Sequence, residues 1–202
     1  MSAEGWMNMQ SGNGRARDKD SVLKGLAAGV IGGLVAAWTM NQFQAALGKL
    51  MENEERSHGA QSLQQGSPEH GIGRELQQRG SDEPDDNAAV RAANAVAELG
   101  FAEHLTKAEK ELGGAIAHYA MGTTSGAIYG AMAEILPVST VGLGLPFGAV
   151  VWLTADEWVV PQLGLSRSPA EYPLSTHVYS FTSHLVYGLT TELVRRAVRS
   201  AL

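Results

Sequence analysis

The segment from Leu112 to Leu136 constrains the fold of this chain more than any other part of the sequence. Its 25 residues, LGGAIAHYAMGTTSGAIYGAMAEIL, contain one histidine and one glutamate and no other group that is charged near neutral pH. At about 1.5 Å per residue, a helix of this length can cross a hydrocarbon core about 30 Å thick. We therefore predict that this segment forms a membrane-spanning helix.

Glycine recurs in this segment at a spacing that is unfavourable for a lone helix in water, because each interior glycine costs about 1 kcal/mol relative to alanine. In lipid, the same four-residue spacing provides a strip of small residues on which a second helix can pack closely. A matching strip follows Ser21. The six glycines that we assign to helix packing are Gly25, Gly29, Gly33, Gly122, Gly126 and Gly130. They can serve packing within one chain or between the chains of an oligomer.

Charge is distributed unevenly along the 202 residues. The net charge is −6 and the mean hydropathy is −0.10, yet residues 52–111 hold 13 of the 21 acidic residues. We predict an all-α, polytopic membrane protein with four transmembrane helices. Its regions are a disordered cytoplasmic tail (1–20), a first transmembrane helix (21–50), an acidic polar insert with a short amphipathic surface helix near 87–99 (51–105), and three further transmembrane helices with a basic C-terminus (106–202).

Local signals divide the last region into its three helices. Thr106 and Glu109 form a capping-box pattern, so the second span begins ahead of the apolar segment, and Pro137 ends it. A third apolar run follows, in which Pro146 predicts a kink or a late helix start. The fourth run begins at Leu174 and is the least apolar, so its polar side is expected to face other helices.

Four spans place both termini on the same side of the membrane. Basic residues gather at both ends of the chain, namely Arg15, Arg17, Lys19, Lys24, Arg195, Arg196 and Arg199. Since Lys and Arg are enriched on the cytoplasmic side, we predict a bacterial inner-membrane protein with cytoplasmic termini and an external insert. A secretory signal peptide is the rival interpretation of residues 21–50, but the long, acid-containing stretch ahead of it argues against a signal peptide.

Composition and motifs exclude several classes of function. The chain has no cysteine, which excludes disulfides, thiolate metal sites and covalently attached c-type haem. The mild acidity without a basic patch argues against nucleic acid as a partner. We find no phosphate loop, nucleophile elbow or zinc-protease motif, and so predict no enzymatic activity.

Ionisable side chains at membrane depth are costly, so each one in the predicted spans requires a role. Under the four-span topology, one polar cluster lies near the outer ends of the spans and contains His118, His177, His184, Asp156 and Glu157. Each histidine can simply hydrogen-bond a hydroxyl or carbonyl of a neighbouring helix. Three chemical interpretations stand beside that one: a proton path or pH sensor, a divalent metal site, and haem b held by two facing histidines.

A second polar group lies at the predicted inner ends of the spans. It consists of Glu134, Glu192 and Arg195, with Arg196 as a further candidate partner. Ion pairs between such groups at the headgroup level would fix the registry of the helices. We therefore predict a structural role for the inner group.

A family resemblance extends over residues 112–200. Its most specific part is His184-Leu185-Val186 followed by Glu192 and the arginines after it. The other residues that carry it are His118, Tyr129, Glu134, Pro137, Pro161, Gly164, Leu165 and Pro169. In this pattern the chain resembles the YagU-like family of bacterial inner-membrane proteins, whereas residues 40–105 depart from it. The resemblance implies a four-helix inner-membrane protein but no settled biochemical activity.

These observations together predict a small YagU-like membrane protein that lies in the lipid bilayer and acts as a homo-oligomer or within a membrane complex. We expect a proton- or pH-linked role carried by His118, His177, His184 and Asp156. No cofactor is predicted. The alternatives are a haem- or metal-binding subunit and a purely structural subunit of a larger membrane complex.

Overall fold

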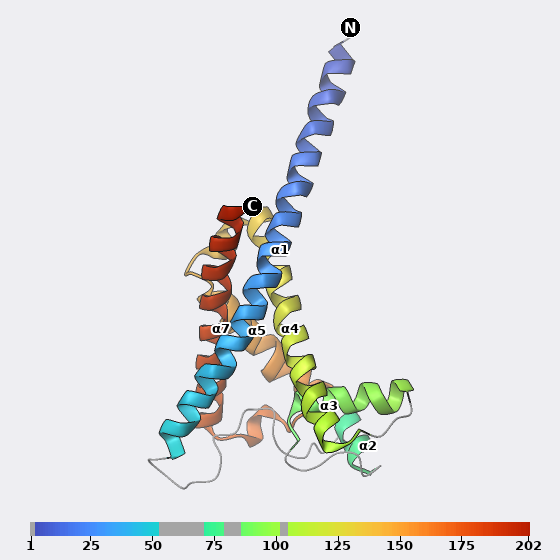
Figure 1. Ribbon diagram of the computed structural model, residues 1–202, viewed down its shortest axis with the longest axis vertical. Coiled ribbons are helices and arrows are strands. Elements are labelled where there is room, and N and C mark those ends of the chain that lie inside the picture. Colours follow the sequence, from blue (N-terminus) through green and yellow to red (C-terminus); the bar gives the residue numbers. More distant parts are fainter. Residues whose placement is uncertain (1–2, 53–70, 79–85, 102–104) are drawn as a thin grey trace.

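The computed structural model describes residues 3–52, 71–78, 86–101 and 105–202. Within these ranges the chain forms helices and turns and no strand, which confirms the all-α class. Four long helical stretches form the body of the molecule, and two short helices, from the insert, lie against one end of it (Figure 1).

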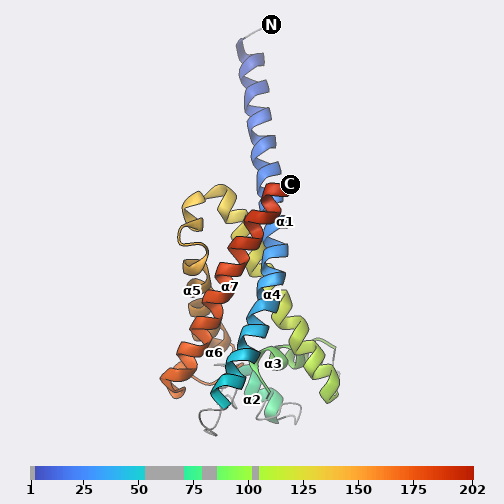
Figure 2. The same cartoon turned by 60° about the vertical axis from the view of Figure 1, so that its left-hand side comes forward.

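The long helices run alternately up and down. They are α1 (Ala3–Glu52), α4 (Lys107–Ile135), α5 (Leu145–Thr154) and α7 (Leu174–Ala201). A π-helical turn, η3 (Ala155–Val159), and the short α6 (Val160–Gln162) continue α5. α1 packs against both α4 and α7, and α5 packs against α7 (Figures 1 and 2).

The N-terminal tail differs from the sequence prediction, because α1 begins at Ala3 and residues 3–20 continue the helix. Figure 1 shows these first turns projecting beyond the bundle, past the C-terminus. Good helix formers such as alanine, methionine, glutamine and arginine recur in this stretch, and they allow a helix that is anchored further along to extend. Asp20 and Lys24, four residues apart and 3.1 Å from each other, add an ion pair on the helix surface.

The insert contributes three helical elements, α2 (Gly71–Gln78), α3 (Ala88–Ala95) and the π-helical turn η1 (Val96–Gly100). α3 and η1 correspond to the short helix predicted near 87–99, and Asn87 caps it by accepting a hydrogen bond from the Val90 amide at 3.0 Å. α2 was not predicted from the sequence. Residues 53–70, 79–85 and 102–104 of the predicted acidic insert lie outside the described residues.

Helix boundaries in the second half follow the local signals in the sequence. Thr106 and Glu109 form the predicted capping box at the start of α4. Hydrogen bonds from the side chain and the backbone of Thr106 hold the pKa of Glu109 below its usual value. Pro146 lies in the first turn of α5, so it produces a late helix start, after turns in which Gly142 and Gly144 adopt positive φ angles.

The backbones of α1 and α4 touch along the two predicted glycine strips. A Cβ atom placed on Gly29 would lie 2.9 Å from the Cα of Gly130, and one placed on Gly33 would lie 3.0 Å from the Cα of Gly126. Gly25 faces Gly130 in the same way. Real Cβ atoms do not fit at such distances, so this contact requires glycine on both helices.

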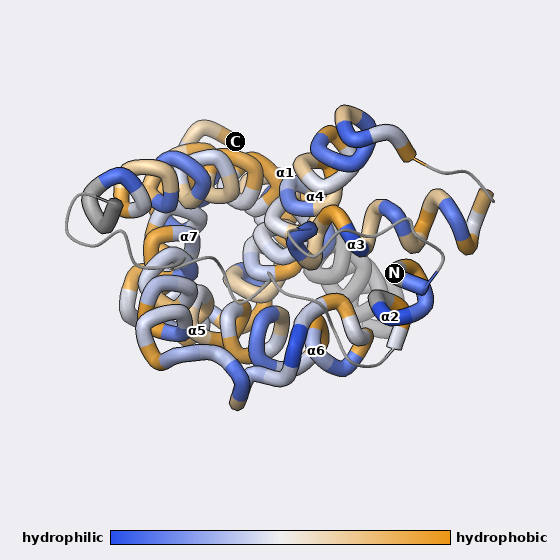
Figure 3. The backbone as a smooth tube through the Cα atoms, turned by 90° about the horizontal axis from the view of Figure 1, so that it is seen from below, coloured by the Kyte–Doolittle hydropathy of each residue, from blue (hydrophilic) through white to orange (hydrophobic). Residues whose placement is uncertain are grey.

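Many polar and charged side chains are buried beside the apolar ones, and many large apolar side chains are exposed, which is unusual for a water-soluble protein. Ser183, Thr191 and Glu192, all on α7, are 0% exposed. Large apolar side chains face outward from all four long helices, among them Leu34, Ile128 (57% exposed), Leu153 and Leu174 (77% exposed). Figure 3 shows that apolar and polar residues are interspersed along the helices when the bundle is viewed from below.

Among the described residues, one helix is long and apolar enough to cross a membrane by length and composition alone. It covers Lys19–Lys49, with a mean hydropathy of 1.6 in its most apolar window. A core helix or an N-terminal signal sequence would satisfy the same criterion. Ser, Thr and Gly lower the hydropathy of α4 and α7, and α5 has only 10 residues before its π-helical turn. This criterion therefore establishes one candidate span and not four.

The glycine contact predicts opposite effects for the same substitution at two positions of α1. Gly29→Ala should destabilise the purified protein by about 1–3 kcal/mol, because the added methyl group would meet the α4 backbone. Gly48→Ala should be neutral or stabilise the helix by up to about 1 kcal/mol, since a Cβ at Gly48 has no neighbour within 4 Å. Thermal unfolding of the two variants, followed by circular dichroism, measures both changes in stability. Equal shifts in the unfolding midpoint of the two variants would contradict the predicted contact.

Candidate functional site: a polar cavity inside the bundle

A cavity of about 260 Å³ lies between α1, α4, η3 and α7, near the end of the bundle that carries α3. Its polar lining comes from four helical elements and from the residue that caps α3. These residues are Asn41 and Gln44 on α1, His118 and Ser125 on α4, Asp156 on η3, Ser180, His184 and Tyr187 on α7, and Asn87, which caps α3. No lysine or arginine belongs to the lining among the described residues.

Asp156 and His184 form the most deeply buried titratable pair of this cavity. Their exposed fractions are 4% and 7%. The Ser180 hydroxyl donates a hydrogen bond to an Asp156 carboxylate oxygen, and His184 Nδ1 lies 3.7 Å from the same oxygen. His184 Nδ1 also lies 2.9 Å from the Ser180 carbonyl oxygen, to which it must donate. In the neutral ring Nε2 is therefore the acceptor.

The π-helical turn explains how two consecutive carboxylates both meet α7. Asp156 and Glu157 lie in η3, where the wider helix turn directs them toward two histidines that are two turns apart on α7. Glu157 lies 2.7 Å from His177 Nδ1, and His177 Nε2 lies 3.0 Å from the Pro169 carbonyl. The structure thus divides the predicted outer cluster: the His177–Glu157 pair does not line the cavity, whereas Asp156 and His184 do.

His118 completes the wall of the cavity on the α4 side. Its ring lies against the Ala37 carbonyl of α1, and its Nε2 atom is buried without a hydrogen-bond partner among the described residues. Buried polar atoms without a partner are rare in folded proteins. Among the described residues, no group of three or more His, Asp or Glu side chains is placed to hold a metal ion.

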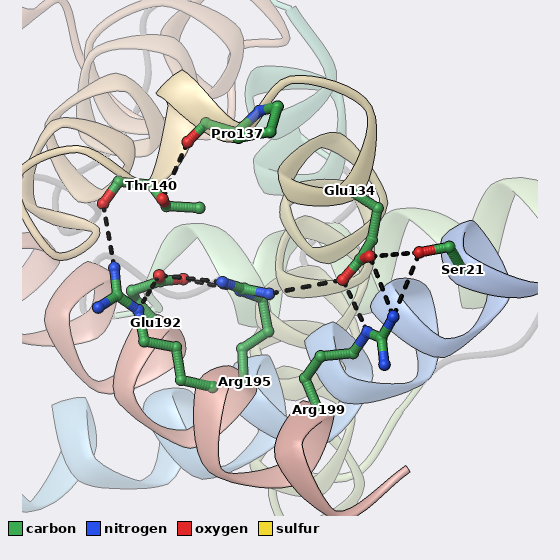
Figure 4. Close-up of polar contacts among 8 residues, drawn as sticks. Ser21, Glu134, Pro137, Thr140, Glu192, Arg195 and Arg199 are labelled. Atoms are coloured by element: carbon green, nitrogen blue, oxygen red, sulfur yellow. Dashed lines mark hydrogen bonds and ion pairs between the residues drawn. The ribbon is translucent and has the colours of Figure 1, made fainter. Parts of the chain in front are cut away.

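A second polar cluster, here termed the arginine–glutamate cluster, lies at the opposite end of the bundle (Figure 4). Glu134 accepts hydrogen bonds from Arg199 Nε at 2.8 Å and from the Ser21 hydroxyl at 2.5 Å. Glu192 accepts from Arg195 Nε at 2.7 Å and from Arg196 Nε at 2.5 Å. Because these residues lie on α1, α4 and α7, the cluster joins three helices.

The predicted inner ion pairs are thus only part of this cluster. Arg195 does contact Glu192, but its distance to Glu134 is 3.9 Å, and Arg199 is the closer partner of Glu134. Ser21 and Arg199 were not among the predicted site residues. The sequence offered a signal for Arg199, which lies one helical turn beyond Arg195 and Arg196, but it offered none for Ser21.

Sequence reasoning also missed part of the cavity lining. Asn41 and Gln44 read as interface residues at the end of the first apolar run, and Tyr187 gave no functional signal. Ser180 lies four residues before His184, so helical spacing places it on the same face, although it was not among the predicted site residues. The Tyr187 hydroxyl donates to the Gly122 carbonyl at 2.6 Å and so contributes to the α4–α7 contact at the cavity floor.

The arginine–glutamate cluster predicts a large stability cost for removing its buried acid. Glu192→Gln should destabilise the protein by about 3 kcal/mol or more, because Glu192 is 0% exposed and its loss leaves Arg195 buried without its nearest counter-charge. Asp20→Asn is the matched control. It breaks the exposed pair with Lys24 and should change stability by less than about 1 kcal/mol. Thermal unfolding midpoints of the two variants test the difference, and similar small shifts would show that the cluster does not stabilise the fold.

No curated protein and no solved structure is detectably similar to this chain. A protein family described as a protein of unknown function, DUF1440, matches residues 83–193. The matched segment includes the cavity residues of α4, η3 and α7 as well as Glu134 and Glu192, and it leaves out α1 and the arginines after residue 193. Because the match covers more than half of the 202 residues, the chain belongs to the DUF1440 family of unknown function.

Proposed function

We propose that this protein is an integral protein of the bacterial inner membrane and that all four long helical stretches cross the bilayer. The exposed large apolar side chains and the polar side chains buried between the helices support this proposal, since such a surface suits lipid better than water. The resemblance of residues 112–200 to the YagU-like proteins supports the same location.

Helix lengths and directions support four spans. α4 has 29 residues and α7 has 28, which correspond to about 40 Å each, and the stretch 145–162 corresponds to about 27 Å. Each is close to or longer than a hydrocarbon core of about 30 Å. The alternating directions bring the arginine–glutamate cluster and the C-terminus to one end, and the excess of arginine there supports a cytoplasmic position for this end.

In this orientation the cavity lies toward the outer side of the membrane, and we propose that it binds and releases protons. The observation that carries the proposal is the buried Asp156–His184 pair on the cavity wall. Protonation of His184 would create a charge that Asp156 can balance. His118 on α4 and Tyr187 on α7 are the other titratable groups that face the cavity, and the polar side chains that α1 contributes are neutral amides.

This assignment favours the proton-linked role over the alternatives in which a cofactor is bound. The cavity is smaller than the roughly 300–1,000 Å³ of pockets for drug-sized ligands, and haem b is larger than most of those ligands. We further propose that the protein acts as a homo-oligomer. Apolar side chains on the outward face of α4, such as Leu112, Ile116 and Ile128, provide a surface for lipid or for a second copy.

The proposed topology can be tested with single cysteines, because the chain contains none. Ser175→Cys, at the outer start of α7, should react with a membrane-impermeant maleimide in intact spheroplasts. Ser200→Cys, in the last turn of α7, should react only after the membrane is permeabilised. Both serines are exposed in the fold. Labelling of both residues from the same side would contradict a membrane-spanning α7, and recovery of the protein in the soluble fraction without detergent would contradict the membrane location itself.

The proton-linked role predicts that the cavity histidines are required and that His177 is not. In liposomes with an imposed pH gradient, replacing His118 and His184 together by Gln should lower proton flux by about tenfold or more, because both titratable rings leave the cavity. His177→Gln is the matched control and should retain the flux, since His177 pairs with Glu157 outside the cavity. Equal flux through the wild-type protein and the double variant would overturn the proposed role.

A further inference from the structure

The described lining of the cavity is rich in hydrogen-bond acceptors and contains an acidic side chain but no lysine or arginine, and proton binding alone does not require this composition. We infer that it binds a small organic cation, a primary alkylammonium, whose N–H groups are held by Asp156, His184 and His118. This inference deepens the proposed function and rests on the same site, but its test measures binding and not proton movement.

Hydrogen-bond acceptors converge on the cavity from opposite walls. The Asp156 carboxylate can accept several hydrogen bonds. The Nδ1 proton of His184 is used on the Ser180 carbonyl, so the other nitrogen of the neutral ring is an acceptor. On the facing wall, the His118 Nε2 atom is buried and has no partner among the described residues. A ligand with several N–H donors on one atom would satisfy these acceptors together.

The charge of the lining favours a cation over an anion. Asp156 is the acidic member of the described lining, and no lysine or arginine accompanies it there. An ammonium group would form charge-assisted hydrogen bonds with the carboxylate in a setting largely shielded from water, where such bonds are stronger than neutral ones. A carboxylate or phosphate would instead meet Asp156 as a like charge.

The remaining walls and the size of the cavity define the rest of the ligand. Met40, Met121 and Val151 provide apolar surface that suits a short alkyl chain, and methionine side chains adapt well to different shapes. At about 30 Å³ for each water molecule, 260 Å³ corresponds to the volume of roughly eight or nine waters, which limits the ligand to a small molecule. Quaternary ammonium ligands are usually held by aromatic cages, whereas Tyr187 is the aromatic side chain of this lining apart from the two imidazoles.

The position of the neutral amides indicates how such a ligand would reach the site. Asn41 and Gln44 lie toward the end of α1, and Asn87 caps α3, so all three line the outer part of the cavity. Amide side chains can exchange hydrogen bonds with a passing ammonium group without holding it as strongly as a carboxylate would. The ligand would therefore enter from the end that carries α3 and stop at Asp156.

The test is isothermal titration calorimetry of the full-length, detergent-purified protein with n-butylammonium chloride near pH 7.5. We expect saturable binding with one site per chain, and weak or no binding of sodium butyrate and of tetramethylammonium chloride. Asp156→Asn should weaken butylammonium binding about tenfold or more, because it removes the charge partner. His177→Gln should bind as the wild type does. Equal binding of butyrate, unchanged affinity in Asp156→Asn, or no binding to the wild-type protein would overturn the inference.

A second variant keeps the test decisive if Asp156→Asn does not fold. Ala115 lines the cavity but is exposed, so Ala115→Trp should narrow the cavity while leaving the core and the Asp156–His184 pair in place. It should abolish butylammonium binding with an unchanged circular dichroism spectrum. The two proposals fail separately: binding without proton flux contradicts only the proton-linked role, and proton flux without binding contradicts only the ammonium site.

Discussion

The antiparallel contact between α1 and α4 sets the register of both polar sites. Facing residues follow one another at intervals of four along each helix: Ser21 with Glu134, Gly25 with Gly130, Gly29 with Gly126, Gly33 with Gly122, and Ala37 with His118. Glycine in the middle of this series lets the backbones touch, and touching backbones cannot slide past each other without a clash. The series therefore fixes Ser21 on Glu134 at one end and the Ala37 carbonyl on His118 at the other.

The polar face of α7 depends on that contact, because α1 covers it together with α5. Thr191, Glu192 and Arg195 would be costly in a bundle whose helices could separate, since each unpaired charge away from water must be compensated. Packing against α1 holds Gly32 close to the Thr191 carbonyl, and the arginine–glutamate cluster then closes around Glu192. The polar side chains that lower the hydropathy of α7 therefore also give this helix specific partners inside the molecule.

Much of the architecture could be predicted because its signals are local. The capping box at Thr106, the late start that Pro146 imposes and the start of α7 at Leu174 all follow from one or a few residues. The polar face of α7 was visible because His177, Ser180 and His184 recur at helical spacing. Residues that line one helical face can be read from a sequence without knowing which helix faces them.

The features that could not be predicted depend on long-range contacts or on departures from regular helix geometry. The outer cluster was expected to be one group, but the π-helical turn separates it by giving Asp156 and Glu157 different histidine partners. Ser21 contacts Glu134, 113 residues away, and no local pattern in the sequence indicates this partner. The helical N-terminal residues before Asp20 carry no periodic apolar pattern that would indicate a helix, and the pattern of α2 is limited to Ile72 and Leu76, four residues apart.

The two polar sites are separated by a layer that limits how protons could pass between them. The Tyr129 and Phe147 rings stack at 4.2 Å between centroids, and the Tyr187 hydroxyl is tied to the Gly122 carbonyl. In the same layer a Cβ atom on Gly188 would lie 2.8 Å from the Cα of Gly148, so α5 and α7 leave no room between their backbones. Under the proposed function, a proton held by Asp156 and His184 would therefore exchange through the end of the bundle that carries α3 in this conformation. Passage to the arginine–glutamate cluster would require α5 to move away from α7 at Gly188, and the cavity and the cluster would then be open in different conformations.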